Sequence, residues 1–199
     1  MTTHRKWRAV GGFLRLSLVL AVLAAVLPSA AQPSATQPLT EHTIELDGQA
    51  MRYAIRAFPP DTRAAEATTT LEPVSAINTA MLLDRLLTVG LIEDAALLSN
   101  APRRRFEVLR DYEAAVGADG FKQVFIQYFR PENRLIAEIV MDRHSLLVWH
   151  LSRDNRYAGQ YYVRVEAKVL MDDVPSENRA RLRRLLEAIR SGKMQLPTQ

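Results

Sequence analysis

The chain has 199 residues, with 26 lysines and arginines against 22 aspartates and glutamates, and its formal net charge is +4 at pH 7. It contains no cysteine, which excludes disulfide bonds, thiolate metal ligands and a lipid-modified cysteine at the start of a mature chain. A chain of this length is expected to form one domain of ordinary size around a single core.

Residues 1–31 have the three parts of a secretory signal peptide. Three basic residues lie among the first eight, an apolar run extends from residue 13 to residue 27, and Ser29 and Ala31 stand at the −3 and −1 positions of a cleavage site. The apolar run is shorter than the about 20 residues that a membrane-spanning helix needs. We therefore predict cleavage after Ala31 and a bacterial-type periplasmic or secreted location, with an uncleaved anchor as the alternative.

Cleavage would also remove the excess of positive charge. Four of the 26 basic residues and none of the 22 acidic residues precede residue 32, which leaves 22 of each sign. A chain without net charge has no overall attraction to nucleic acid, so we expect no nucleic-acid partner and, after cleavage, no stable membrane span. Residues 32–40 are predicted to form a disordered leader, residues 41–192 a single domain and residues 193–199 a flexible tail.

The first half of the domain is predicted to be a β-hairpin followed by three helices. Between residues 42 and 57, polar and apolar residues alternate on both sides of Asp47-Gly48, a pair typical of a tight hairpin turn. Helical spacing of apolar residues then predicts helices over residues 74–89, 91–98 and 102–116.

From residue 121 the apolar pattern changes to a period of two. It predicts strands over residues 121–130, 134–142, 145–151 and 160–171. Their connections are too short for parallel crossovers, so the strands should form an antiparallel meander. Ser176 is expected to cap a last helix that runs to residue 191. The predicted fold is therefore α+β: an N-terminal hairpin, three helices, a four-stranded antiparallel meander that curls over the helices, and a C-terminal helix.

The chain has no motif that names a reaction. It lacks a Gly-x-Ser-x-Gly nucleophile elbow and a glycine-rich phosphate loop. His42, His144 and His150 have no metal-ligand spacing, so we expect no metal and no cofactor. His144 is expected at an exposed turn. His150 is interpreted as a half-exposed strand residue, with a base in a pocket as the alternative.

Several polar side chains interrupt apolar segments. Glu138 lies in an otherwise apolar strand, Arg164 and Glu166 share a face of the last predicted strand, and Asp84 interrupts the first helix. Cross-strand ion pairs on a solvated face explain the strand residues, whereas a concave pocket would raise the pKa of a carboxyl group and suit acid/base chemistry. The candidate catalytic residues are Glu138, His150 and Asp84, and the candidate ligand-binding residues are Tyr128 and Arg164.

Two helices carry clusters of arginine. Arg103, Arg104 and Arg105 open the third predicted helix, and the last helix has five arginines against two glutamates between residues 177 and 190. Both clusters are interpreted as solvated faces, with binding to an anionic partner or surface as the alternative.

The segment Leu86-Leu87-Thr88-Val89-Gly90, followed by the acidic pair Glu93-Asp94, an apolar second helix and the later meander, resembles the cystatin-like α+β cone superfamily over residues 74–171. This superfamily includes the nuclear-transport-factor-like and SnoaL-like proteins. The resemblance implies a conical pocket between the sheet and the helices, used for small-molecule binding, for isomerase or dehydratase chemistry, or within a dimerising scaffold. No position matches the catalytic Asp and His of the family.

Three functions are compatible with these patterns. The first is a non-catalytic exported protein that binds a small ligand or an envelope-protein partner. The second is a metal-independent acid/base pocket enzyme of the isomerase or dehydratase type. The third is a structural cell-envelope protein that docks through its arginine-bearing helices. A homodimer is compatible with each of them.

Overall fold

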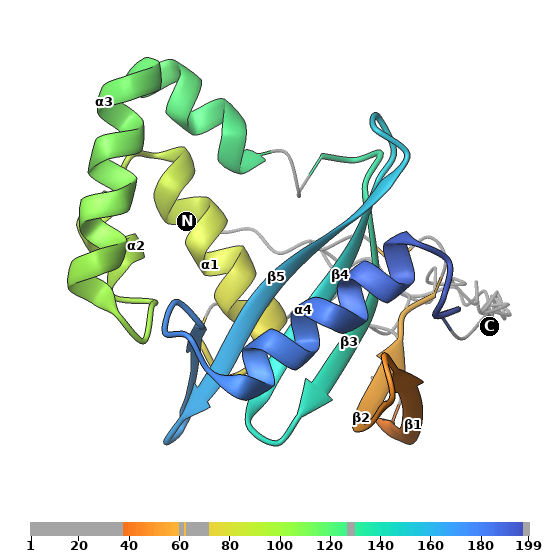
Figure 1. Ribbon diagram of the computed structural model, residues 1–199. Helices are drawn as coiled ribbons and strands as arrows, with labels where there is room; N and C mark the ends of the chain where they lie inside the picture. Colours follow the sequence, from red (N-terminus) through yellow and green to blue (C-terminus); the bar gives the residue numbers. More distant parts are fainter. Residues whose placement is uncertain (1–37, 60–61, 63–71, 127–129, 197–199) are drawn as a thin grey trace, which may run out of the picture. The chain divides into compact units, whose positions relative to one another are not determined.

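The computed structural model describes residues 38–59, 62, 72–126 and 130–196 (Figure 1). Residues 1–37, which hold the predicted signal peptide and most of the predicted leader, lie outside this description. The described elements are, in chain order, β1 (Thr40–Leu46), β2 (Gln49–Ala57), α1 (Ala76–Thr88), α2 (Ile92–Ala96), α3 (Pro102–Ile126), β3 (Arg134–Met141), β4 (His144–Leu151), β5 (Arg156–Val165), β6 (Lys168–Met171) and α4 (Glu177–Arg190).

The six described strands form one antiparallel sheet in the order β1-β2-β3-β4-β5-β6. The α+β class and the antiparallel connections are thus confirmed, but the predicted four-stranded meander is corrected to six strands. The N-terminal hairpin is part of this sheet, because β2 pairs with β3 over residues 54–57. Its turn is the predicted one: Asp47 and Gly48 have φ of 52° and 75°, and two such residues form the turn that matches the twist of a hairpin.

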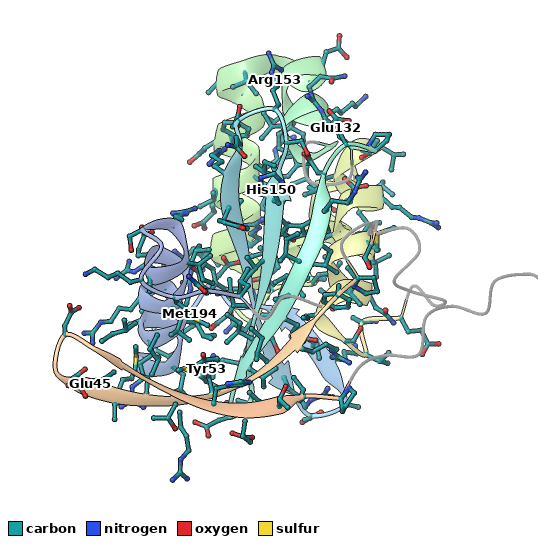
Figure 2. All side chains as sticks on the ribbon, turned by 90° about the vertical axis from the view of Figure 1, so that its right-hand side faces the viewer. Glu45, Tyr53, Glu132, His150, Arg153 and Met194 are labelled. Carbon is teal, nitrogen blue, oxygen red and sulfur yellow. The ribbon has the colours of Figure 1, made fainter. Side chains whose placement is uncertain are left out.

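Helices cover both faces of the sheet, whereas the sequence predicts a sheet that curls over helices on one side. Helix α4 packs on one face, where Leu146 and Val148 meet Leu185, and α1 packs on the other, where Leu147 and Trp149 lie in the same cluster as its alanines. Figure 2 shows the sheet between these two helical layers. The reason lies in β4, which is apolar at successive positions and needs cover on both sides.

Helix α3 replaces one predicted strand. Alternation predicts a strand over residues 121–130, but α3 continues to Ile126, and this prediction is wrong. The rings of Phe121 and Phe125 lie 4.8 Å apart, and Phe121 is fully buried in a cluster with residues of α1 and α2. Aromatic residues four positions apart fit both a period of two and a helical period, and the contacts with the other helices decide for the helix.

The strand predicted over residues 160–171 is two strands. β5 ends at Val165, Glu166 turns the chain with φ 53°, and β6 returns from Lys168. β5 also begins four residues before the predicted start, because the turn after β4 needs only residues 152–155. Arg164 and Glu166 therefore do not share a strand face. A turn through Glu-Ala has no glycine, proline or asparagine, so the sequence carries no signal for it.

Helix α4 begins where the sequence predicts. The hydroxyl oxygen of Ser176 accepts a hydrogen bond from the backbone N–H of Arg179 at 3.2 Å, which is the N-cap interaction. After α4, Met194 is buried in the cluster between α4 and the sheet, although it lies in the segment for which the sequence predicts a flexible tail. Among the described residues, no helix has the length and apolar character needed to cross a membrane.

Candidate functional site

A cavity of about 250 Å³ lies between α1, α3 and the strands β5 and β6, and we call it the α1–α3 cavity. Helix α1 contributes Ala80, Leu83, Asp84 and Leu87, which have the i, i+3, i+4, i+7 spacing of one helix face. Three of these side chains are apolar, so Asp84 is the polar group on this wall. The remaining wall residues are Arg105, Val124 and Phe125 from α3, Gly159 and Gln160 from β5, and Met171 from β6.

A break in α3 brings both ends of that helix to the cavity. Gly117 interrupts the helix with φ 76° and ψ 161°, a conformation that glycine adopts without the steric cost of a Cβ atom. In an unbroken helix, Arg105 and Phe125 would be about 30 Å apart, at 1.5 Å per residue. Because the chain bends at Gly117, Arg105 and Phe125 line the same cavity, and Figure 1 shows the bend at the top of α3.

Asp84 has an unusual environment for a carboxyl group. Its side chain is half-buried, and its Oδ1 atom is buried without a hydrogen-bond partner among the described residues. Burial raises the pKa of Asp84 to about 6, and the adjacent Arg85 guanidinium opposes this rise. A buried acceptor without a partner costs on the order of 1–3 kcal/mol. Oδ1 of Asp84 is therefore able to accept a hydrogen bond from a donor in the cavity.

Two other polar groups lie in the cavity wall. The Nη1 atom of Arg105 is 3.7 Å from Oδ1 of Asp173, while its Nε is buried without a partner in the described part of the chain. The Oε1 atom of Gln160 accepts hydrogen bonds from Nε1 of Trp149 at 3.0 Å and from the hydroxyl of Tyr162 at 3.3 Å. An amide whose oxygen is occupied offers its NH₂ group as a donor. The wall thus holds one carboxyl group and two groups that donate hydrogen bonds.

A second depression lies beside α2 and is lined by Leu91, Glu93, Asp94 and Arg110, among others. These four side chains are exposed, and each carboxyl or guanidinium group can be hydrated there. It has no buried polar atom that lacks a partner in the described residues. The α1–α3 cavity is therefore the better candidate site.

Glu138 lies on the α1-covered face of the sheet but outside the cavity wall. It is buried and forms an ion pair with Arg56, its direct cross-strand neighbour in β2. The register aligns Glu138 with Leu147 and Leu147 with Gln160, so two strand spacings, roughly 10 Å, separate Glu138 from the cavity wall. Glu138 thus forms a cross-strand ion pair, but on a buried face and with Arg56 of β2, whereas the sequence predicts such pairs on a solvated face.

The other sequence-predicted site residues lie away from Asp84. His150 is at the end of β4 near Arg153 and Glu132 (Figure 2), and its Nε2 atom is 3.1 Å from Oδ1 of Asn155. It belongs to the sheet face that α4 covers, because its register partner Tyr157 packs in that layer. Arg164 is exposed at the end of β5. Tyr128 lies outside the described residues.

His144 is buried, which corrects the expectation of an exposed turn. The turn needs only Asp142 and Arg143, so His144 is already the first residue of β4. Its Nδ1 atom lies 2.9 Å from Oδ2 of Asp172, whose Oδ1 accepts a hydrogen bond from the Asn100 side chain at 3.0 Å. These three side chains join β4, the end of β6 and the start of α3. Because they do not line the α1–α3 cavity, we assign them a structural role.

Sequence reasoning missed Arg105 and Gln160 as wall residues. A signal for Arg105 exists: it lies four residues before Leu109, which is buried, and therefore on the inner side of α3 rather than with Arg103 on the solvated side. Gln160 has no comparable signal, because its position in the wall follows from the pairing of β4 with β5.

Within the described residues, no group of three or more His, Asp or Glu side chains is placed to hold a metal ion. Comparison of the chain with protein-family models, with curated proteins and with solved structures gives no match. The resemblance to the cone superfamily therefore stays a prediction, and a function can be inferred only from the geometry of the site.

Proposed function

We propose that this chain is an exported, non-catalytic binding protein that holds a small and largely apolar ligand in the α1–α3 cavity. The observation that carries the proposal is Asp84, a half-buried carboxyl group with an unpartnered buried oxygen in a wall that is otherwise mostly apolar. A ligand with an N–H or O–H group would supply the missing hydrogen bond, and its apolar body would fill the remaining space. Export rests on the predicted signal peptide.

The volume limits the size of the ligand. A dry cavity of about 150 Å³ accommodates benzene, so a cavity of about 250 Å³ has room for one ring with a short substituent. Dinucleotides and other large cofactors exceed this volume. We therefore expect a compact molecule with one polar group directed at Asp84.

The test compares 4-methylphenol with toluene, which differ by one hydroxyl group. We expect both probes to raise the melting temperature of the full chain, because they bind the folded state, and 4-methylphenol to raise it more. The difference between the probes should vanish in Asp84→Leu and persist in Asp111→Asn, which changes an exposed carboxyl group on α3. If neither probe shifts the melting temperature or shows contact with the protein by ligand-observed NMR, the proposed site is wrong.

A second function, a metal-independent acid/base enzyme of the isomerase or dehydratase type, is favoured by the same carboxyl group. A pKa of about 6 keeps both protonation states populated near neutral pH, which suits a general acid or base. The test is exchange of the α-protons of cyclohexanone in heavy water. A rate above that of buffer, rising with pH through about 6 and lost in Asp84→Asn, would support catalysis, and a rate equal to that of buffer would leave binding alone.

A further inference from the structure

A second surface, independent of the cavity, combines basic and aromatic side chains where α4 lies over β5. It consists of Arg179, Arg183, Arg190, Tyr157 and Tyr161, and we call it the arginine–tyrosine strip. The guanidinium carbon of Arg179 lies 5.6 Å from the ring centroid of Tyr161, and Nε of Arg190 donates a hydrogen bond to the backbone oxygen of Tyr157 at 3.0 Å. Both tyrosines are half-buried. Figure 1 shows α4 in front of the sheet, alongside β5.

The three arginines lie on one flank of α4. Their spacing of four and eleven residues places them within about 40° of each other around the helix axis and spreads them over about 16 Å along it. Burial raises the pKa of the Tyr161 hydroxyl, the Glu187 carboxylate adds to this rise, and the guanidinium groups of Arg190, Arg179 and Arg183 oppose it. All three cations are thus close to one phenol group.

Acidic side chains balance only part of this charge. Glu187 pairs with Arg190 at 2.8 Å, and Glu177 pairs with Arg181, which is not part of the strip. No acidic side chain in the described residues forms an ion pair with Arg179 or Arg183. The strip therefore presents an excess of positive charge on a domain whose basic and acidic residues are equal in number after residue 31.

The chemistry of the strip fits the surface of an anionic lipid bilayer. Guanidinium groups bind phosphate in pairs of hydrogen bonds, and each arginine near an anionic leaflet adds a modest, salt-dependent attraction. Tyrosine, with an apolar ring and a polar hydroxyl, is suited to the boundary between apolar and aqueous layers. Because the mature chain has no net charge, such an attraction depends on this local patch.

We propose that the arginine–tyrosine strip docks the domain reversibly on the surface of a membrane that contains anionic phospholipid. This inference rests on the proposed export, because an exported chain meets membrane surfaces rather than nucleic acid. The contact is peripheral: α4 keeps its apolar stripe on the sheet and presents arginines, not apolar residues, to the bilayer.

The test is co-sedimentation of the full chain with vesicles of phosphatidylcholine alone or mixed equally with phosphatidylglycerol. We expect the protein to bind the mixed vesicles more tightly than vesicles of phosphatidylcholine alone. Added salt should reduce this difference. The double variant Arg179→Glu/Arg183→Glu should bind the mixed vesicles about 30-fold or more weakly, as expected for the loss of two arginines near an anionic surface.

The matched control is Arg103→Glu/Arg104→Glu, which makes the same change of charge at exposed positions of α3. Any contribution of residues 1–31 to vesicle binding is common to both variants and cancels in their comparison. Arg183→Gln, at an exposed position, serves as a milder variant if the double variant unfolds, and should weaken binding several-fold.

Three results would overturn the proposal. The first is equal binding to both kinds of vesicle. The second is an equal loss of binding in the α4 and α3 variants, which would assign the effect to overall charge. The third is tighter binding of a single-stranded oligonucleotide than of mixed vesicles, lost in the α4 variant, which would identify nucleic acid as the occupant. None of these results bears on ligand binding in the α1–α3 cavity.

Discussion

At the scale of single residues, the carboxyl group of Asp84 lowers the stability of the folded state. A ligand that donates a hydrogen bond to it would offset this loss. The carboxyl group of Asp84 is partly shielded from water by the apolar side chains around it, and one oxygen has no partner within the described residues. Binding sites commonly contain such groups, because a polar group that already makes all its hydrogen bonds in the free protein cannot form a new one with a ligand. Asp84 and Arg105 share this property, since each keeps a buried polar atom without a partner there.

The raised pKa of Asp84 predicts how stability depends on pH. The pKa of Asp84 is about 6 in the folded chain and has the ordinary aspartate value of 3.8 in the unfolded chain, so between these pH values only the folded chain keeps the proton. The folded state thus binds more protons in this window, and the free energy of unfolding falls as pH rises through it. Asp84→Asn, which stays neutral, should be more stable than the wild type above pH 6 by on the order of 1 kcal/mol, because solvent partly screens the half-buried group.

Urea unfolding at several pH values measures this difference. It should shrink towards zero below about pH 3, where the wild-type carboxyl group is protonated in both states. The control is Asp111→Asn, the same substitution at an exposed position of α3. A stabilisation by Asp84→Asn that is the same at all pH values would contradict the assignment of the cost to ionisation.

Breaking the His144–Asp172 pair should destabilise the protein, in contrast to the change at Asp84. Both side chains are nearly inaccessible to solvent, and Asp172 also accepts the hydrogen bond from Asn100. Asp172→Ala should lower the free energy of unfolding by about 3 kcal/mol, because it removes the partner of the buried His144 ring and of the half-buried Asn100 amide. His144→Ala combined with it should cost less than the sum of the single changes, by about 1 kcal/mol or more. Strictly additive costs in a double-mutant cycle would rule out the pair.

At the scale of elements, the close packing of α4 on the sheet depends on Gly159 of β5, which has no side chain. A Cβ atom on Gly159 would lie 2.7 Å from Cδ1 of Leu146 and 2.7 Å from Cδ2 of Leu186. One of these leucines belongs to β4 and the other to α4, so the helix contacts the sheet directly over the backbone of β5. Gly159 also lines the α1–α3 cavity, which lies on the opposite face of the sheet from α4.

Gly159→Ala should therefore destabilise the protein by about 1–3 kcal/mol, the usual cost of an added methyl group in a filled core. Gly120→Ala is the matched control: its Cβ atom would meet only Val116 of the same helix, at 3.4 Å, and alanine favours the helix by up to about 1 kcal/mol. Thermal unfolding measures both. Combining Gly159→Ala with Leu186→Ala should cost less than the two changes added, and a fully additive result would count against close packing at this point.

At the scale of the whole molecule, the sheet is enclosed by α4 on one face and α1 on the other. The two surfaces for which we propose functions lie in different layers. The cavity lies between the sheet and the helices α1 and α3, while the arginine–tyrosine strip lies on the α4 side. A ligand in the cavity and a membrane on the strip would contact opposite layers and would not compete for the same residues.

Export and cleavage of the predicted signal peptide can be tested by expression of the full chain. Expressed in a bacterial host, the protein should be recovered from the periplasm or medium with Gln32 as its first residue, as the small residues at −3 and −1 require. Ala31→Leu should block processing because it enlarges the −1 side chain, whereas Ala30→Leu, at the tolerant −2 position, should not. Mass spectrometry of the mature N-terminus decides between them. A chain that stays whole and cytoplasmic would contradict export.

How far local patterns predict the structure differs from one element to another. The hairpin at Asp47-Gly48, the start of α3 at Pro102 and the cap at Ser176 follow from a few adjacent residues, and were predictable for that reason. The extension of α3 through Phe121 and the turn at Glu166 were not, because each depends on contacts with distant elements. Asp84 was identifiable as a polar interruption of an apolar stripe, but the cavity beside it was not.

The sequence by itself determined the α+β class, the antiparallel connections and the hairpin turn, since these depend on short connections and on the conformational preferences of neighbouring residues. Only the tertiary structure decided that helices cover both faces of the sheet, that His144 meets Asp172, and that Asp84 shares a cavity with Arg105. The physical reason is that these relations join residues far apart in the chain, through packing and strand register, and a local period of two or 3.6 residues contains no information about which distant side chain will be the neighbour.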